Sequence, residues 1–502
     1  MAAWPKHPII YEINTWVWLQ ELSQERGRKV TLANVPPEQW DSVAELGLDG
    51  VWLMGVWERS PASIRISMAN AALVADFRRA VPDFTPEDNM GSPYSVRRYS
   101  VDERLGGPSG LASARRELAR RGLRLILDYV PNHVATDHPW AVEHPEYFVH
   151  GSEEDHLRDP AEYTRVNEHI MACGKDPYFP AWRDVLQLNA FHPGLRQAAA
   201  ETVSEIASQC DGMRCDMAML VMNAIFERTW GRRLGGRHLG DQHVGPRPDQ
   251  EFWPELIGHV KARHPETLFI AEAYWDLEWE LQQQGFDYCY DKRLYDRLEH
   301  ESAESIRLHL TADLGYQEKL VRFIENHDER RAAEVFPEAR GRAAAVVSLS
   351  LPGAKLLHEG QLEGRKTRLP VFLARRPHEP ADEALHAFYK KLLRAIRAKI
   401  FRDGKWQLCE HTGWPDNQSH QNLLSWCWRK GRERRLIAVN LHPHRSQGRL
   451  QVPWHDLGGR RWRLRGVLSG EVFERSGREM LDPGLFVDLE GWGVHFFDCT
   501  PI

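Results

Sequence analysis

The sequence predicts an α/β protein: a (β/α)8 TIM barrel with a small inserted domain after strand 3 and a C-terminal antiparallel β-sandwich. Two observations lead to this fold class. Short apolar runs recur along the first 400 residues with amphipathic stretches between several of them, and after that point short strand-like runs follow one another without helices. Alternating strands and helices indicate βαβ units and a parallel sheet. A doubly wound open sheet fits the same alternation and stays open as an alternative.

The apolar runs have the length and composition of strands that are buried on both faces. Eight of them can be counted if the weaker run 285–290 is included, which is the number that closes a barrel. They are Ile9–Asn14, Gly50–Met54, Leu123–Asp128, Gly212–Asp216, Leu268–Glu272, Gly285–Tyr290, Leu320–Ile324 and Ala354–Leu357.

Two intervening stretches carry clear helix signals. Leu111–Arg121 has apolar residues at helical spacing among Arg and Glu and stops at Gly122, a favourable residue just past a helix end. Pro193–Gln209 opens with proline in its first turn and continues with Ala, Val and Ile at helical spacing. These helices support the barrel interpretation.

The alternation of strand-like and helix-like segments is interrupted in two places, and these interruptions define the predicted domains. Residues 134–189 are rich in His, Pro, Asp and Tyr and lack helical periodicity, so we expect a small inserted domain there. After a helix near Leu385–Ile400, the runs at 423–428, 435–440, 449–452 and 484–488 are punctuated by Gly, Pro and Asp, as in a sandwich. The predicted division is a barrel of 1–133 and 190–400, the insertion 134–189, and a C-terminal domain 401–502.

Composition narrows the classes of partner. The net charge is −6 and the basic residues are scattered, so no basic stripe predicts nucleic-acid binding. No run of 18 uncharged apolar residues predicts a membrane span, and the first residues lack the apolar segment of a signal peptide. Seven irregularly spaced cysteines argue against a disulfide framework, so we expect a cytoplasmic protein. The sequence predicts no oligomeric state.

Polar residues at the ends of the apolar runs point to a functional site. Asp128 ends one run, Arg214 and Asp216 the next, Glu272 another, and His327 with Asp328 follows a fourth. A single Asp at a strand end is more often a cap or a salt bridge. Several acids at the carboxyl ends of different barrel strands favour a functional site instead. Uncompensated carboxylates in one pocket repel each other, so a purely structural role does not explain them.

Glycosidic bond cleavage needs such a set of acids. One carboxylic acid with a raised pKa protonates the leaving oxygen, and one ionised carboxylate attacks the anomeric carbon or activates a water. A further carboxylate can stabilise the cationic transition state. The strand-end acids of this chain could fill these roles.

Four segments in order give the chain a resemblance to the α-amylase family of glycoside hydrolases (glycoside hydrolase family 13). They are Asp128–His133, Gly212–Asp216, Glu272–Trp275 and Glu325–Asp328, and the segments Gly91–Ser95 and Asp184–Asn189 are also similar to family segments. The resemblance covers nearly the whole chain. It implies a retaining mechanism on α-glucosidic bonds, an inserted domain after the third strand and a C-terminal sandwich.

The resemblance also implies a role for each site residue. The catalytic set would be Asp216 as nucleophile, Glu272 as general acid and base, and Asp328 as transition-state stabiliser. Arg214 would orient Asp216. The cleavage subsite would further contain Tyr94 stacked beneath the sugar, His133 and His327 as hydrogen-bond donors, and Asp128 nearby.

The chain departs from the pattern of many starch-cleaving members, which carry Lys-His three and four residues after the nucleophile. Met219 and Leu220 stand there instead, and the inserted domain is short. We therefore expect short α-glucosides or α-glucan oligosaccharides as the carbohydrate substrate. No metal or other cofactor is predicted, although a structural calcium ion held through Asn132 stays an alternative to local hydrogen bonding of that side chain.

Other readings of the same residues stay open. A transglycosidase would pass the glucosyl unit to a sugar or to phosphate, and the run Arg365–Arg368 after the last barrel strand is either a solvated loop or a phosphate site. A catalytically inactive carbohydrate-binding or scaffold protein would fit the same fold. A metal-dependent hydrolase is less favoured because the acids lack an accompanying set of histidines.

Overall fold

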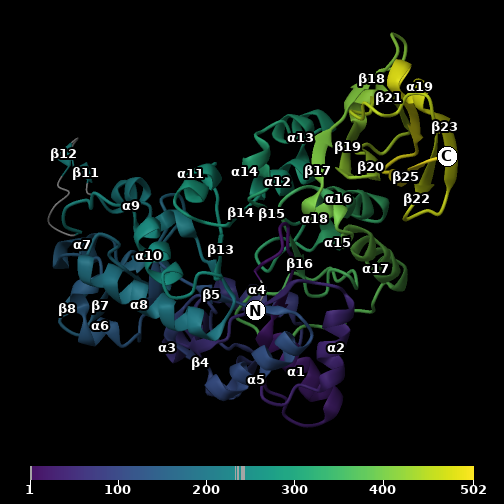
Figure 1. Cartoon of the computed structure of the whole chain (residues 1–502). Helices are drawn as coiled ribbons and strands as arrows, with labels where there is room; N and C mark the ends of the chain where they lie inside the picture. The colour runs from purple at the N-terminus through teal and green to yellow at the C-terminus, as the bar shows by residue number, and fades with distance from the viewer. Residues whose placement is uncertain (1–2, 232, 235–236, 239–243) are drawn as a thin grey trace.

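The computed structural model describes residues 3–231, 233–234, 237–238 and 244–502. Met1 and Ala2, at the start of the predicted barrel range, lie outside the described residues. Within the described chain eight parallel strands close into a barrel in the order β1-β2-β5-β10-β13-β14-β15-β16 (Figure 1). They are β1 (Ile9–Asn14), β2 (Gly50–Met54), β5 (Arg124–Tyr129), β10 (Gly212–Cys215), β13 (Leu268–Ala271), β14 (Tyr288–Tyr290), β15 (Leu320–Arg322) and β16 (Ala354–His358). The predicted barrel is confirmed, and its closure excludes the open doubly wound sheet.

Helices surround the barrel and connect its strands. The three helices expected from the sequence are present, as α5 (Gly107–Arg120), α8 (Pro193–Gln209) and α17 (Glu383–Ile396). Helix α5 begins four residues earlier than expected, after Gly106 at a positive φ of 106°. The others are α1 (Thr15–Arg26), α2 (Pro37–Glu45), α9 (Asn223–Trp230), α10 (Phe252–Lys261), α11 (Glu278–Gln283), α12 (Lys292–His300), α13 (Ala303–His309), α14 (Leu314–Gln317), α15 (Ala332–Val335), α16 (Ala339–Ser350) and α18 (Ile400–Asp403).

The strands between β5 and α8 form a separate small sheet. Its order is β6-β9-β8-β7, with β6 (His133–Ala135), β7 (Tyr163–Val166), β8 (His169–Gly174) and β9 (Trp182–Gln187). The short helices α6 (Trp140–Glu143) and α7 (Glu153–Arg158) accompany it. A small apolar cluster that includes Val134, Phe148, Met171 and Leu186 gives this insertion its own core. The predicted insertion after the third barrel strand is therefore present.

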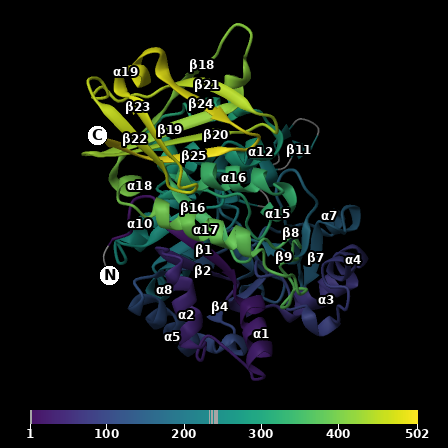
Figure 2. The same ribbon diagram turned by 90° about the vertical axis from the view of Figure 1, so that its right-hand side faces the viewer.

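A second addition to the barrel was not predicted from the sequence. The antiparallel pair β3 (Trp57–Arg59) and β4 (Val96–Val101) is separated in sequence by the helices α3 (Pro61–Ala69) and α4 (Ala71–Ala80). Helix α3 contacts β9 of the inserted sheet, and the two helices lie beside β7–β9 in Figure 2. Phe77 of α4 packs with Phe84 and Phe372 at ring separations of 5.4 and 5.5 Å.

The C-terminal part consists of two antiparallel sheets, as predicted. One has the order β17-β19-β20-β25-β22-β23 and the other β18-β21-β24. Apolar side chains from both sheets, among them Leu436, Leu450 and Val487, share one core. The strands are β17 (Lys405–Leu408), β18 (Glu410–Thr412), β19 (Leu423–Lys430), β20 (Glu433–Asn440), β21 (Ser446–Gln451), β22 (Arg461–Gly466), β23 (Val472–Ser476), β24 (Leu485–Leu489) and β25 (Val494–Pro501).

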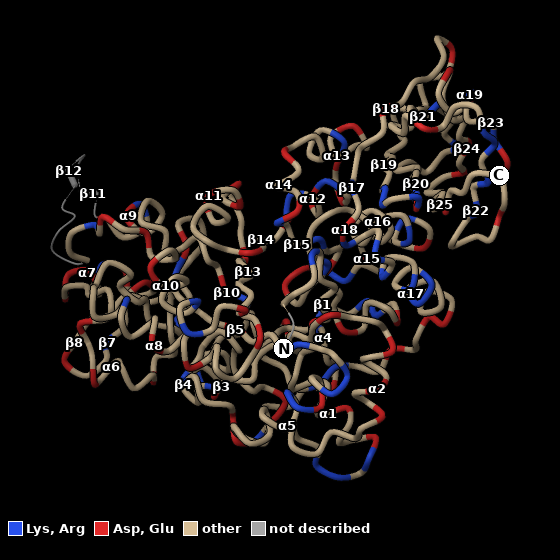
Figure 3. Tube along the Cα trace, viewed as in Figure 1, with Lys and Arg blue, Asp and Glu red and all other residues tan. Residues whose placement is uncertain are grey.

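The charged residues are interspersed along the chain. Lys and Arg alternate with Asp and Glu over all parts of the trace in Figure 3. No helix among the described residues is long and apolar enough to cross a membrane.

Candidate active site

The predicted acids meet at the carboxyl ends of the barrel strands. Asp128 is the second-last residue of β5, Asp216 directly follows β10, and Glu272 directly follows β13. Because neighbouring parallel strands end at the same rim, residues distant in sequence come together there. Asp128, Asp216 and Glu272 are each at most 5% exposed, so their charges must be balanced locally.

Arg214 provides that balance. Its Nη1 lies 2.7 Å from Oδ1 of Asp216 and 3.9 Å from Oδ1 of Asp128, and its Nη2 lies 2.8 Å from Oε2 of Glu272. The guanidinium also packs against aromatic rings, with its carbon 5.1 Å from the Tyr94 ring and 5.3 Å from the Trp52 ring. One buried cation therefore faces both the predicted nucleophile and the predicted acid.

Both carboxylate oxygens of Glu272 accept hydrogen bonds. The Tyr274 hydroxyl donates to Oε1 at 2.9 Å, and the backbone N–H of Met217 donates to Oε2 at 2.6 Å. Burial raises the pKa of Glu272 to about 7; the charges of Asp216 and Asp328 add to the rise, and Arg214 opposes it. A carboxyl group with this pKa holds a proton over part of the neutral range, as a general acid requires.

Asp216 is buried beside the same cation. Burial raises the pKa of its carboxyl group, and the ion pair and hydrogen bond with Arg214 oppose the rise. Its backbone N–H donates to the carbonyl of Tyr129 at 2.8 Å, which ties it to the neighbouring strand. Asp128 accepts a hydrogen bond from the N–H of Gly55 at 3.1 Å, and burial raises its pKa as well.

His327 and Asp328 form a second charged group on the same rim. Nε2 of His327 lies 3.0 Å from Oδ2 of Asp328 and 2.6 Å from the Tyr94 hydroxyl, and Nδ1 lies 2.5 Å from Oε1 of Glu12. Burial lowers an imidazole pKa, but the carboxylates of Asp328 and Glu12 raise the pKa of His327 well above its usual value. The ring is therefore held as an imidazolium between two carboxylates.

Asp328 remains the most accessible of the acids. Its side chain is 40% exposed, whereas the His327 side chain is 2% exposed. Burial of the carboxyl group would raise its pKa, but the His327 imidazolium holds the pKa of Asp328 well below its usual range. The backbone carbonyl of Asp328 accepts a hydrogen bond from Nε of Arg368 at 2.9 Å.

Of the last two predicted site residues, Tyr94 contacts the charged centre and His133 lies at its edge. The Tyr94 ring stacks on His327 with centroids 5.4 Å apart, in direct contact with the charged centre. His133 opens β6, and its ring lies 5.2 Å from that of Trp182. Burial lowers the pKa of His133 to about 4, so the ring is neutral at neutral pH. None of its hydrogen bonds within the described chain joins it to Asp216, Glu272 or Asp328.

Two residues of this centre escaped the sequence analysis. Glu12 is fully buried in β1 and pairs with His327. It is a carboxylate inside an apolar run, the same anomaly that singled out Asp128. Tyr274, next to Glu272, carried no such signal, because a tyrosine near a strand end is ordinary.

Left-handed backbone conformations flank two of the acids. Met217, after Asp216, has a φ of 39°, and Trp275 and Asp276, after Glu272, have φ values of 64° and 63°. Non-glycine residues adopt such angles rarely, and they cluster where a site fixes the backbone. The Met217 N–H reaches Glu272 from this strained turn.

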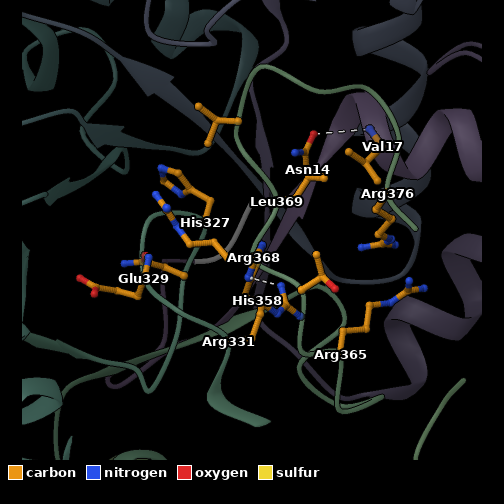
Figure 4. A pocket seen from close by; sticks show the side chains of 13 residues that line it. Asn14, Val17, His327, Glu329, Arg331, His358, Arg365, Arg368, Leu369 and Arg376 are labelled. Atoms are coloured by element: carbon orange, nitrogen blue, oxygen red, sulfur yellow. Dashed lines mark hydrogen bonds between the residues drawn. The ribbon is translucent and has the colours of Figure 1, made fainter. Parts of the chain in front are cut away.

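The run 365–368, for which the sequence left a solvated loop and a phosphate site open, lies at a small cavity. Arg331, Arg365, Arg368 and Arg376 line a small cavity beside His327 (Figure 4). Arg331 pairs with Glu325 at 3.0 Å and Arg376 with Glu359 at 2.5 Å. The cavity encloses about 30 Å³, room for an ordered water rather than a phosphate group.

Asn132 is engaged locally. Its Oδ1 accepts from Nε2 of Gln187 at 2.9 Å, and its Nδ2 donates to Oε1 of Gln187 at 3.2 Å. Among the described residues no three His, Cys, Asp or Glu side chains are grouped to hold a metal ion.

The family model for the α-amylase catalytic domain matches residues 37–423. α-Amylase MalA of Haloarcula japonica is 25% identical over 405 residues, which cover 78% of this chain and 49% of that protein. α-Amylase 3 of Dictyoglomus thermophilum is 20% identical over 403 residues, 76% of this chain and 68% of that protein. The chain thus spans about half the length of the first relative.

A solved structure has the same fold over its full length. The maltogenic α-amylase AmyB of Thermotoga neapolitana superposes with a TM-score of 0.68 at 18% identity, covering 99% of both chains. At this identity the likeness shows the fold, while the family match spans most of the chain. The chain belongs to the α-amylase family of glycoside hydrolases.

Proposed function

We propose that this protein hydrolyses α-glucosidic bonds in short α-glucosides or α-glucan oligosaccharides, with retention of configuration. The observation that carries the proposal is the shared contact of Arg214 with Asp216 and Glu272. Carboxylate oxygens that contact neighbouring nitrogens of one guanidinium lie close together. This favours the spacing of about 5–5.5 Å of retaining glycosidases over the wider spacing that leaves room for a water in inverting ones.

In the first step Asp216 attacks the anomeric carbon and forms a glycosyl ester, while Glu272 gives its proton to the departing glycosidic oxygen. Arg214 keeps Asp216 ionised and oriented. In the second step Glu272, now a carboxylate, takes a proton from water, whose oxygen attacks the anomeric carbon and releases Asp216. The pKa of about 7 at Glu272 suits both roles.

Asp328 stabilises the cationic transition state and binds sugar hydroxyls through its exposed carboxylate. The His327 imidazolium and Arg368 hold Asp328 in place, so His327 positions Asp328 before it contributes to the sugar. Tyr94 lies beneath the cleavage subsite, and neutral His133 donates or accepts one hydrogen bond at its edge. Asp128 anchors the rim through Gly55.

The test is product release from α-linked disaccharides, maltooligosaccharides and soluble starch. We expect Asp216→Asn and Glu272→Gln to lose on the order of 10³-fold or more in kcat/KM. Glu205→Gln, at an exposed position on α8, should keep the wild-type value. Equal activity of Asp216→Asn and wild type would overturn the assignment. A steady rise in kcat/KM up to long starch would contradict the preference for short substrates.

Transfer to a sugar or to phosphate uses the same covalent intermediate and differs only in the acceptor. The same assay with added glucose or inorganic phosphate distinguishes the two outcomes, because transfer yields a new disaccharide or a glucosyl phosphate. We propose water as the acceptor, and the small volume of the cationic cavity at 365–376 gives no support to a phosphate site there.

We also propose the domain division 1–133 with 190–400, 134–189, and 401–502. The strand positions of the barrel, the inserted sheet and the C-terminal sheets support it. All seven cysteines are buried and free, which supports the proposal of a reducing, cytoplasmic location.

A further inference from the structure

Tyr290, the last residue of β14, lies at the barrel rim and has no part in the reaction steps proposed above. It is 1% exposed, and its ring packs against that of Phe323 with centroids 5.2 Å apart. Strand β14 runs parallel to β13 with Cys289 opposite Ala271, so the next step of this register brings Tyr290 level with Glu272. A tyrosine in this place brings a hydroxyl group to the buried acids.

The ring of Tyr290 is one of three that surround the guanidinium group of Arg214. The guanidinium carbon lies 5.8 Å from the centroid of Tyr290, 5.1 Å from that of Tyr94 and 5.3 Å from that of Trp52. Attraction between the cation and the ring faces stabilises the buried charge. The hydroxyl of Tyr94 is engaged with His327, whereas that of Tyr290 is free to serve Arg214.

Three buried polar atoms of this centre make no hydrogen bond of ordinary geometry within the described part of the chain. They are Nε of Arg214, the hydroxyl oxygen of Tyr290 and Oε2 of Glu12. The first is a donor, the second is both donor and acceptor, and the third is an acceptor. Because a buried polar group without a partner is costly, most such groups in folded proteins are paired. The hydroxyl of Tyr290 has the chemistry to pair with both of the others.

The charges that act on the Tyr290 hydroxyl indicate which contact each side makes. Burial raises its pKa well above the usual value, so the hydroxyl keeps its proton. Arg214 lowers that pKa as a cation and as a hydrogen-bond donor, and among the carboxylates Glu12 raises it most, followed by Glu272. Both carboxylate oxygens of Glu272 already accept hydrogen bonds. This leaves Oε2 of Glu12 as the acceptor for the hydroxyl proton.

We propose that Tyr290 is a positioning residue that joins the ion pairs of Arg214 to the buried carboxylate of Glu12. Its hydroxyl accepts a hydrogen bond from Nε of Arg214 and donates its own proton to Oε2 of Glu12. With Nε held in this way, the guanidinium keeps Nη1 on Asp216 and Nη2 on Glu272. The inference rests on the proposed function and adds to it a residue of the sixth barrel strand.

Tyr290→Phe keeps the ring and removes only the hydroxyl. The guanidinium of Arg214 is then held at one point fewer and can move away from the acids. Arg214 opposes the raised pKa of both Asp216 and Glu272, so both limbs of the kcat/KM pH profile should move to higher pH. We expect kcat to fall by about tenfold, as for the loss of one hydrogen bond to a charged group. A role in packing alone would lower stability and leave both limbs in place.

The experiment compares the pH profiles of wild type, Tyr290→Phe and the matched control Tyr288→Phe on an α-linked oligosaccharide. Tyr288 is the first residue of the same strand and is 8% exposed, but the charges that act on its hydroxyl are those of Asp287, Arg402 and Glu318. Tyr288→Phe should keep both limbs and the wild-type kcat. Glu12→Gln and the double variant Tyr290→Phe/Glu12→Gln complete a double-mutant cycle, measured by denaturant unfolding.

Both single variants of the cycle break the same contact, so their effects should not add. We expect the unfolding equilibrium constant of the double variant to differ from the product of the single effects by at least about threefold. Additive effects, or limbs that stay in place in Tyr290→Phe, would overturn the inference. The cycle needs no turnover, so additivity refutes the link between Tyr290 and Glu12 by itself, whereas absence of α-glucoside hydrolysis by the wild type refutes the proposed function.

Discussion

The hydroxyl of Tyr274 donates a hydrogen bond of 2.9 Å to Oε1 of Glu272, the residue two positions before it in the chain. A donor to a carboxylate oxygen stabilises the ionised form and so lowers the pKa of the acid. This contact opposes the burial that raises the pKa of Glu272, and it fixes the orientation of the carboxyl group. In the proposed mechanism Tyr274 is therefore a positioning residue for Glu272.

Tyr274→Phe removes only this donor. We expect the pKa of Glu272 to rise by about one unit, because a hydrogen bond to a charged group contributes about 1.5–3 kcal/mol and one unit corresponds to about 1.4 kcal/mol. The alkaline limb of the kcat/KM profile should move upward accordingly. Tyr147→Phe, in the insertion and away from Asp216, Glu272 and Asp328, should leave the profile unchanged. An unshifted limb in Tyr274→Phe would show that the hydroxyl does not tune Glu272.

The pH dependence of the wild-type protein follows from the two acids. The proposed mechanism needs a protonated Glu272 in its first step, so kcat/KM should fall as the pH rises through about 7. Asp216 must be ionised, and its raised pKa places the acid limb above the usual range of an aspartate. A bell-shaped profile on an α-glucoside checks both statements. An alkaline limb several units higher would contradict Glu272 as the acid.

The buried pair of Glu12 and His327 gives a prediction about stability. Glu12→Gln keeps the shape of the side chain but removes one of the two charges that hold the imidazolium. We expect a loss of about 3 kcal/mol in the free energy of unfolding at pH 6, measured by denaturant titration, because breaking a buried ion pair leaves the other charge unbalanced.

The sign of the pH effect follows from the raised pKa of His327. Its stabilising contribution is fully present below the unfolded pKa of about 6.5 and is lost as the pH rises through the folded pKa. In Glu12→Gln the folded pKa is lower, so the difference in stability between variant and wild type should shrink at high pH. A difference that stays constant from pH 6 to 10 would contradict the charged state of His327.

One buried tryptophan joins the C-terminal sheets to the barrel. Trp428 of β19 is 1% exposed, and its Nε1 donates to the carbonyl of Ser350 at the end of α16 at 2.9 Å. Trp428→Ala should lower the free energy of unfolding by about 3–5 kcal/mol, while kcat/KM of the folded fraction stays near the wild-type value. A large change in kcat/KM without a change in stability would show that the sandwich acts on the site directly.

The barrel could be predicted because its strands are buried on both faces and so appear as unbroken apolar runs. The C-terminal strands were found only in part. In β22 the sequence Arg-Trp-Arg-Leu-Arg alternates exposed Arg with buried Trp462 and Leu464, and β23 carries few buried residues, so neither forms an apolar run. Strand pairing across the sheet, rather than local pattern, defines them.

In the candidate site, too, local sequence pattern identifies single residues but not the contacts between distant ones. Strand-end acids could be identified from sequence because each interrupts or ends an apolar run. The pairing of Glu12 with His327, 315 residues apart, depends on β1 and β15 lying on either side of β16 in the closed barrel.

The most direct test of the central claim is the configuration of the sugar first released. Proton NMR of a maltooligosaccharide digest, recorded before mutarotation, shows which anomer forms. Retention through a glycosyl ester on Asp216 predicts the α-anomer first, with the β-anomer appearing later by mutarotation. Initial release of the β-anomer would contradict a covalent intermediate on Asp216. The carboxylates around Arg214 would then not act as a retaining pair.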